Sequence, residues 1–445
     1  MAERHDVVVV GAGSAGAVMA GRLSERPDRT VLLLEAGPDH DSAHTPASIA
    51  GANFLEAMLE PERMWTDMLA TRTAEQGPRL YARGRGAGGS SAVNAMIAIP
   101  GEPGDYDEWE TAYGCTGWNW SAVAPWFERI ALPIHQARSH EVGSVARALF
   151  AAEPTAELAP LTRFPDGRRA STNDVYVEPA RSRPNFCSRG DSLVDRVVFE
   201  GRRAVGVLLA DGTHIEAGAV VLAAGAVHSP AILLRSGVDL PGIGQGLQDH
   251  PSIPIALHMR DGHVAAPGRL AGSACLRATH LETNDLQLLA LDMVDPAMPW
   301  LGLLMGAVMR VHSRGSLRLA SADPMAHPLI DFNMLDDERD VVAMRAAAAL
   351  TERVAQSAAI AAVADVEPYD VSDDALRRSV GDYVHAIGTC RMGATGDEMA
   401  VVDTNGCVFG YDGLVVADAS VIPWIMRGNT HLPVVMIAER IAASF

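Results

Sequence analysis

A glycine pattern near the start of the chain limits how it can fold more than any other feature of the sequence. The apolar run DVVVV at residues 6–10 is followed by Gly11, Gly13 and Gly16, and small and apolar residues continue at helical spacing over residues 14–23. In such a pattern the first glycine permits a tight turn, the second lets the backbone approach a pyrophosphate, and the third allows close contact between helix and strand. The order of strand, glycines and helix therefore predicts a nucleotide-binding turn.

A second apolar run, VLLL at residues 31–34, is followed by Glu35, which lies 19 residues after Gly16. A carboxylate at this strand end is placed to accept hydrogen bonds from a ribose diol and would repel a 2′-phosphate, so the pattern disfavours NADP. FAD and NAD both fit these residues. The continuation EAGP at residues 35–38 resembles that of flavoproteins and favours FAD.

Composition and charge exclude several classes of partner. The net charge of −19 opposes binding to nucleic acid or to an anionic membrane, since both need a basic face. No stretch approaches the roughly 20 consecutive apolar residues that a membrane-spanning helix needs. The first predicted strand begins after five residues, which leaves no room for a secretory signal, so we expect a cytoplasmic protein without a membrane span.

The cysteines are scattered without a CxxC pair or any metal-like spacing, and we expect buried thiols, no structural disulfide and no metal site. They are Cys115, Cys187, Cys275, Cys390 and Cys407. At 445 residues the chain is long enough to form two domains.

Three further stretches carry glycine or strand signals. Residues 81–98, YARGRGAGGSSAVNAMIA, form a second glycine-rich loop, which is costly in chain entropy unless something must approach the backbone. Residues 187–225 predict three strands by their apolar alternation and turn residues, the last of them the buried run AVVLAAG. We expect a helix to begin at Ser229 or Pro230 and residues 240–251, LPGIGQGLQDHP, to form a loop.

These motifs and a C-terminal block give the chain a family resemblance. GRGAGGSSAVNAM, GAVHSPAILLRSG, LPGIGQGLQDHP, VHAIGTCRMG and GLVVADASVIPWIMRGNTHLPVVMIAERIA occur in this order. From Asp6 to Ala443 the chain resembles the glucose–methanol–choline (GMC) family of FAD-dependent oxidoreductases. It departs from the family at Ala87, where a larger aliphatic residue is usual, and at Asp239, where glycine is usual. It is also shorter around the substrate region, where only Val238 and Asp239 separate RSG from LPGIG.

The resemblance implies an α/β fold class with two parts. One is a Rossmann-like FAD-binding domain, and the other is an α+β substrate-binding domain built on an antiparallel sheet, with the chain crossing between them several times. The FAD-binding domain would comprise residues 1–45, 76–100, 176–252 and 380–445. The substrate-binding domain would comprise residues 46–75, 101–175 and 253–379.

The resemblance also implies oxidation of an alcohol to an aldehyde or ketone, with hydride transfer to flavin N5 and a histidine base. Histidine suits proton removal because its ordinary pKa of ~6.5 lies near working pH. We assign His385, in YVHAIGTC, as the base and His431, in GNTHLPV, as its hydrogen-bonding partner, with the two roles open to being shared or reversed. His250, in LQDHP, is expected to be structural or near the cofactor.

Two matters stay open in this interpretation. The alternative activity is that of an FAD-containing lyase of the hydroxynitrile-lyase type, which would use the same histidines for proton transfer. The electron acceptor of an oxidase or dehydrogenase would be O₂, a quinone or a carrier protein, and these motifs do not encode which one.

The resemblance finally implies a set of residues in contact with FAD. Around the pyrophosphate and ribose these are Gly11, Gly13, Ser14, Ala15, Gly16, Glu35 and Ala36. In the second glycine loop they are Arg85, Gly88, Gly89, Ser90, Asn94, Ala95 and Met96. Further along they are Val194, Ala224, Gly225, Asp418, Ala419, His431, Leu432 and Pro433. Val93 stands where some relatives carry a histidine linked to the flavin, so we expect non-covalent FAD.

Overall fold

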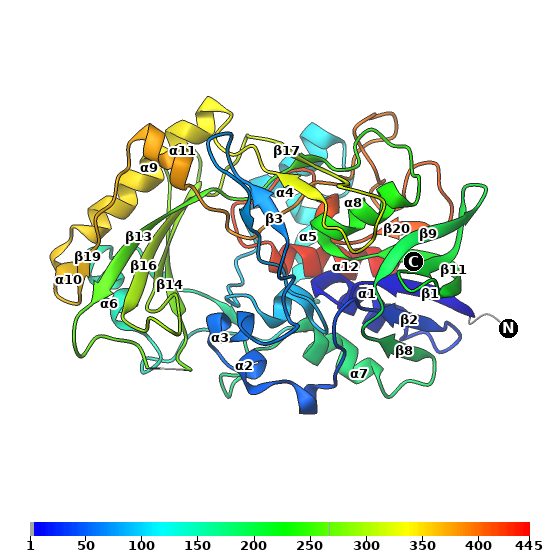
Figure 1. Ribbon diagram of the computed structural model, residues 1–445, viewed down its shortest axis with the longest axis horizontal. Helices are drawn as coiled ribbons and strands as arrows, with labels where there is room; N and C mark the ends of the chain where they lie inside the picture. The colour runs from blue at the N-terminus through cyan, green and yellow to red at the C-terminus, as the bar shows by residue number, and fades with distance from the viewer. Residues whose placement is uncertain (1–3, 267) are drawn as a thin grey trace.

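The computed structural model describes residues 4–266 and 268–445. Two large sheets lie at opposite ends of the molecule (Figure 1). The first has seven strands in the order β8-β2-β1-β11-β10-β9, with β20 also paired to β11. Its strands are β1 (Arg4–Val10), β2 (Val31–Leu34), β8 (Phe186–Arg189), β9 (Val194–Glu200), β10 (Arg203–Leu209), β11 (His214–Leu222) and β20 (Leu414–Val416).

The centre of this sheet is parallel and buried on both faces. Strand β1 pairs in parallel with β2 and β11, and β2 with β8, whereas β9 and β10 are antiparallel. Val7–Val10 and all of β2 are buried, as an apolar run in a doubly covered parallel sheet should be. The predicted strand at 6–10 and helix at 14–23 are confirmed, because helix α1 spans Ser14–Leu23 and packs against the last helix, α12 (His431–Ser444).

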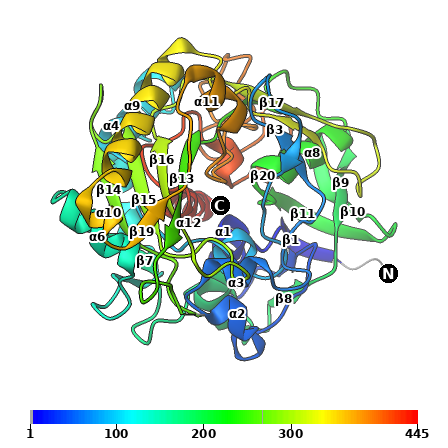
Figure 2. The same cartoon turned by 60° about the vertical axis from the view of Figure 1, so that its left-hand side comes forward.

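The second large sheet is antiparallel throughout, in the order β19-β13-β16-β15-β14-β6. Helix α9 (Glu338–Ala355) covers one face of it, as Figure 2 shows. Its strands are β6 (Glu157–Leu158), β13 (Ser252–Met259), β14 (Gly272–Ala278), β15 (Leu286–Leu291), β16 (Leu301–Val308) and β19 (Ala364–Val366). The expected fold class, a Rossmann-like sheet with a second α+β part on an antiparallel sheet, is confirmed.

Smaller sheets join the two large ones. A five-stranded sheet runs in the order β12-β17-β18-β3-β4, and a two-stranded one pairs β5 with β7. The strands are β3 (Leu69–Thr71), β4 (Arg79–Leu80), β5 (Ile134–His135), β7 (Leu161–Thr162), β12 (Gln245–Leu247), β17 (Gly315–Arg318) and β18 (Leu329–Asp331). The five-stranded sheet takes strands from segments predicted for both domains, so the exact domain boundaries stay a proposal.

The remaining helical segments are short. The α-helices are α2 (Ala47–Ala50), α3 (Phe54–Met58), α4 (Pro103–Tyr113), α5 (Trp120–Phe127), α6 (Ser144–Ala152), α7 (Glu178–Ala180), α8 (Gly225–Arg235), α10 (Ala358–Ala361) and α11 (Asp373–Ser379). Single turns of other helix types lie at Ser42–His44, Gly89–Ala92, Asn173–Val177 and Ala419–Val421. None of the helices in the described ranges is long and apolar enough to cross a membrane.

The predicted start of helix α8 is wrong. The helix begins at Gly225 rather than at Ser229 or Pro230, because Gly225 adopts a φ of 81° and turns the chain directly from β11 into the helix. Pro230 lies inside the helix and has no N–H to donate to the carbonyl of Ala226. The hydroxyl of Thr389 donates to that carbonyl instead, at 2.7 Å, so the proline leaves no buried acceptor unpaired.

Other local predictions also need correction. Residues 187–225 contain four strands rather than three, since β8 precedes the predicted set. The predicted loop at 240–251 contains strand β12, which pairs with β17. The prediction of buried thiols is wrong for Cys187 and Cys407, which are exposed, and the other three cysteines are buried. Cys187 is exposed because it lies on the edge strand β8. All five thiols are free.

Candidate active site

A cavity of about 490 Å³ lies between the two large sheets, within the size range of small-molecule sites. Its wall combines the turn after β1, the second glycine loop, residues 382–386 and the start of α12. Leu289 of β15 and Met305 of β16 close it from the antiparallel sheet. The cavity therefore lies where a cofactor held by the parallel sheet could meet a substrate held by the antiparallel one.

Most of the residues predicted from the sequence line this cavity. From the turn after β1 and the end of β2 these are Gly11, Gly13, Ser14, Ala15, Glu35 and Ala36. From the second glycine loop they are Gly89, Ser90, Asn94, Ala95 and Met96. From the rest of the chain they are Val194, Ala224, Gly225, His385, Asp418, Ala419 and His431.

Five predicted contacts lie outside the cavity wall that the described residues form. Gly16 packs behind the turn, because a Cβ there would lie 1.7 Å from the carbonyl oxygen of Gly11. Arg85 donates to the carbonyl of Ala36 at 2.8 Å, and the N–H of Gly88 donates to that of Ala12 at 3.0 Å. Leu432 and Pro433 lie in the first turn of α12 and are buried. The hydrogen bonds of Arg85 and Gly88 join the second glycine loop to the segments after β1 and β2 behind the wall.

The carboxylate of Glu35 is bound to three different backbone segments. Its Oε2 accepts from the N–H of Ala12 at 2.8 Å. Its Oε1 accepts from the N–H groups of Gly37 and Gly86, at 3.0 and 2.8 Å. A carboxylate has about four lone-pair directions, so one is left for a hydroxyl in the cavity.

The glycine at position 13 tests whether a nucleotide cofactor fits. Gly13 has a φ of −76°, which any residue adopts, and a Cβ there would meet no protein atom closer than 4.0 Å. The protein itself therefore does not require glycine at this position, which faces the cavity. A ligand that approaches the backbone closely would account for the glycine. The N-terminus of α1 at this point has no side-chain cap, so its N–H groups are available to a phosphate.

A strained backbone and a buried carboxylate fix the position of His385. The residue before it, Val384, has a φ of 58°, and a β-branched residue adopts this left-handed conformation only under constraint. Arg83 donates to the carbonyl of Val384. The N–H of His385 donates to Oδ2 of Asp249 at 2.8 Å. Burial raises the pKa of the Asp249 carboxyl above its ordinary value, and the nearby charge of Asp382 adds to the rise.

His431 occupies the first position of α12 and is buried. Its Nδ1 lies 3.0 Å from Oγ of Ser14, in the turn after β1. Its Nε2 is buried without a hydrogen-bond partner among the described residues. Burial lowers the pKa of His431 to about 4, and the charge of Arg169 lowers it further. The ring is therefore neutral near pH 7, with one nitrogen not yet paired.

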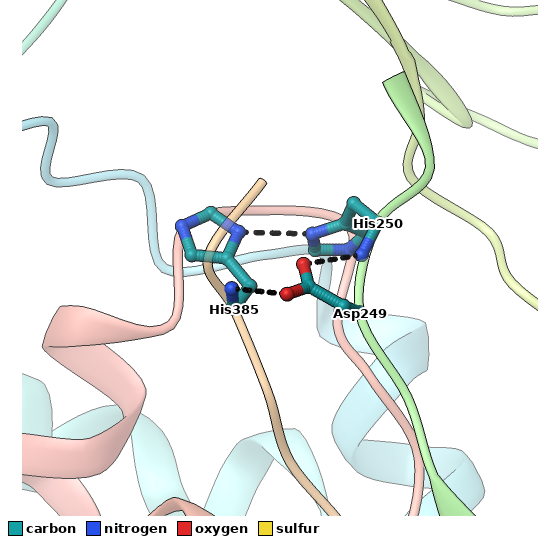
Figure 3. Close-up of side chains that lie close together, drawn as sticks. All are labelled: Asp249, His250 and His385. Atoms are coloured by element: carbon teal, nitrogen blue, oxygen red, sulfur yellow. Dashed lines mark hydrogen bonds between the residues drawn. The ribbon is translucent and has the colours of Figure 1, made fainter. Parts of the chain in front are cut away.

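The expected hydrogen bond between His385 and His431 is replaced by another. Nδ1 of His385 lies 3.0 Å from Nδ1 of His250 (Figure 3). Nδ1 of His431 is bonded to Ser14 instead. His250 was interpreted only as structural or near the cofactor, and no spacing in the sequence links two histidines 135 residues apart. Asn429 was also missed; it lines the cavity with a buried, unpartnered Oδ1, and its place two residues before His431 is the signal that could have found it.

Comparisons with known proteins identify the family of the chain. Family models described as GMC oxidoreductase match residues 5–252 and residues 311–438. A 5-(hydroxymethyl)furfural oxidase of Methylovorus sp. (strain MP688) is 33% identical over an alignment of 527 positions, gaps included, which covers 98% of each chain. An oxygen-dependent choline dehydrogenase of Escherichia coli O6:K15:H31 (strain 536 / UPEC) is 31% identical, with 99% of this chain and 95% of the relative covered. The crystal structure of pyridoxine 4-oxidase from Mesorbium loti has a TM-score of 0.89 and 28% identity, with 99% of both chains covered.

These observations define a flavin-dependent oxidoreductase. The chain belongs to the GMC oxidoreductase family, and it is an FAD-dependent enzyme that oxidises CH–OH groups. The aligned span of 527 residues is longer than the 445 residues of this chain, as expected for a shortened member.

We expect Gly13→Ala and Gly16→Ala to fail in different ways. Gly13→Ala should fold with a free energy of unfolding within about 1 kcal/mol of the parent, because its Cβ would meet no protein atom closer than 4.0 Å, yet retain less FAD. Gly16→Ala should lose about 1–3 kcal/mol or more, because its Cβ overlaps the carbonyl of Gly11. Thermal unfolding and the ratio of flavin to protein absorbance measure the two effects. Full FAD retention in Gly13→Ala would contradict the role given to that glycine.

Proposed function

We propose that this enzyme oxidises a primary or secondary alcohol to an aldehyde or ketone, with His385 as the base and His431 as a hydrogen-bond donor or acceptor to the substrate oxygen. One observation carries the proposal. Both histidines line the same cavity as Glu35 and the uncapped N-terminus of α1. When bound there, FAD would supply the two-electron acceptor that takes a hydride from the carbinol carbon.

The base must be neutral and must face the substrate. Burial lowers the pKa of His385 well below its ordinary value, with smaller contributions from His250 and Arg83. Since Nδ1 of His385 is paired with His250, the free ring nitrogen is Nε2. The hydroxyl O–H bond breaks as the N–H bond forms at Nε2, and the electron pair of the carbinol C–H bond leaves as hydride.

The role of His431 follows from its free nitrogen. With Nδ1 bonded to Ser14, the buried Nε2 can exchange a hydrogen bond with the substrate oxygen. Such a bond would hold the carbinol carbon in one orientation and relieve an unpaired buried group. If the two roles are reversed, His431→Ala rather than His385→Ala will cause the larger loss of rate.

The electron acceptor and the location are further parts of the proposal. The acceptor is O₂ or a quinone or carrier protein. A cytoplasmic location is supported by the five free thiols, two of them exposed.

We propose that FAD is bound without a covalent link. The candidate position for a link is Val93, whose aliphatic side chain lines the cavity and has no nucleophilic atom. Precipitating the protein with acid should therefore release all of the yellow flavin into the supernatant. Flavin that stays with the precipitated chain would contradict this proposal.

We expect His385→Ala to reduce the rate of flavin reduction at least ~100-fold, the usual scale for the loss of a positioned base. The measurement is anaerobic bleaching of the flavin by an alcohol found in a screen with a dye acceptor and repeated with oxygen. His258→Ala is the matched control, because that histidine is half-exposed on β13 and stacks on Trp300. An unchanged rate in His385→Ala would refute the assignment. An oxidised flavin that persists through turnover would instead indicate the lyase.

We expect the rate of flavin reduction to be independent of pH from about 6.5 upward and to fall only in acid. A base acts in its neutral form, and burial lowers the pKa of His385 below the ordinary 6.5 and that of His431 to about 4. Arg83 lies near His385 and also disfavours its protonation, and the carboxyl of Asp249 accepts from the backbone N–H of His385. Stopped-flow reduction over a range of pH measures the acid limb. A limb centred above pH 7 would contradict a neutral buried base.

A further inference from the structure

His250 is fully buried behind the cavity wall, and a backbone carbonyl decides where its proton lies. Its Nε2 lies 3.0 Å from the carbonyl oxygen of Met426. A carbonyl oxygen can only accept, so the proton of His250 must be on Nε2. Burial lowers the pKa of His250 to about 3, so the ring is neutral and its Nδ1 carries a lone pair.

The tautomer of His250 in turn decides the tautomer of His385. The two Nδ1 atoms lie 3.0 Å apart, with the rings nearly perpendicular at 83°. Because His250 offers only a lone pair there, the hydrogen bond requires the proton of His385 to be on its own Nδ1. A neutral imidazole with a proton on Nδ1 has its lone pair on Nε2, on the side of the ring turned away from His250 (Figure 3).

We propose that His250, set by the carbonyl of Met426, is the positioning residue that keeps His385 in the Nδ1–H form and so makes Nε2 the base. The role of His385 as base rests on the proposed function. The assignment of the two tautomers does not. His250 does not touch the substrate; it acts only through the ring of His385.

The neighbouring carboxylate supports this arrangement without competing for the ring protons. Asp249 accepts from the backbone N–H groups of His250, His385 and Tyr383, at 2.7, 2.8 and 3.2 Å. It also accepts from the hydroxyl of Tyr81 at 2.9 Å. Its oxygens therefore fix the two backbones that carry the histidines. Asp249, His250 and His385 could in principle bind a metal ion. The lone pairs of the Asp249 oxygens and of His250 Nδ1 that would ligate the ion accept these hydrogen bonds instead.

The hydrogen bond between His385 and His250 also stabilises His385 after it has taken the proton. When Nε2 of His385 takes the hydroxyl proton, the ring becomes a cation that still donates from Nδ1 to His250. A hydrogen bond from a charged donor is roughly twice as strong as one between neutral groups. The bond to His250 therefore strengthens as the proton moves, which lowers the barrier rather than merely holding the ring.

The direct test is the tautomer itself. Two-bond ¹⁵N–¹H spectra of FAD-loaded protein with ¹⁵N-labelled histidine show which nitrogen of each ring carries hydrogen, and the spectra of His385→Ala and His250→Asn assign the two residues. We expect His385 with hydrogen on Nδ1 and His250 with hydrogen on Nε2. The reverse pattern at either ring would overturn the proposal. This readout does not depend on turnover, so it stands even if His385→Ala leaves the reaction unchanged and the proposed function fails.

Substitutions at position 250 test the consequence for catalysis. His250→Leu removes the acceptor and should lower the rate of flavin reduction at least ~10-fold, toward the ~10⁴-fold seen where an imidazole is held in the wrong tautomer. His250→Asn places an amide oxygen where Nδ1 was and should restore most of the rate. His258→Leu is the control, since that histidine is half-exposed on the following strand. Equal rates in His250→Leu and the parent would overturn the proposal.

A third substitution separates positioning from a purely structural role. In His250→Asp the acceptor is a carboxylate, which stabilises the protonated form of His385 and raises its pKa. The acid limb of the pH–rate profile should then move to higher pH, while His250→Asn leaves it near the parent value. Thermal unfolding and bound flavin show whether each variant is folded before the two profiles are compared. An acid limb at the same pH in both would overturn the proposal.

Discussion

The carboxylate of Glu35 is the interaction on which the cofactor end of the cavity depends. It joins the turn after β1, the segment after β2 and the second glycine loop by accepting from Ala12, Gly37 and Gly86. A charged acceptor with several backbone donors is strong and directional, so these segments cannot move independently. The close approach of the two loops also explains the glycine at position 89. A Cβ on Gly89 would lie only 2.7 Å from the Cα of Gly13.

The substrate end is built on the same physical principle. There the buried carboxyl of Asp249 has the role that Glu35 has at the cofactor end. It accepts hydrogen bonds from the backbone N–H groups of His250, Tyr383 and His385. The backbone at Val384 is held at a φ of 58°, and the hydrogen bond to His250 fixes the ring of His385. Each end of the cavity thus relies on a carboxylate that binds main chain. Because these carboxylates fix the site in the folded protein, the entropy of ordering its groups is lost during folding and not again at each turnover.

The sequence predicted what depends on neighbouring residues and missed what depends on distant ones. Helix α1 and strands β1 and β2 were predicted correctly because glycine spacing and apolar runs are local signals. The start of α8 was wrong because Pro230 is tolerated inside it only through a bond from Thr389 to the carbonyl of Ala226. Likewise, no pattern could pair His250 with His385, and five predicted FAD contacts lie behind the wall because a motif marks a loop but not which way each residue faces.

The interleaving of the first and last segments has a consequence for how the enzyme is made. Strand β20 completes the sheet beside β11, α12 lies on α1, and Arg22 binds Glu439 at 2.8 Å. Until the region around His431 has left the ribosome, the growing chain offers only a partial cofactor site and leaves an edge of β11 without its neighbour. The complete cofactor site therefore forms only after the C-terminal segment has emerged, and the edge of β11 stays open to wrong pairing from the synthesis of β11 until that of β20.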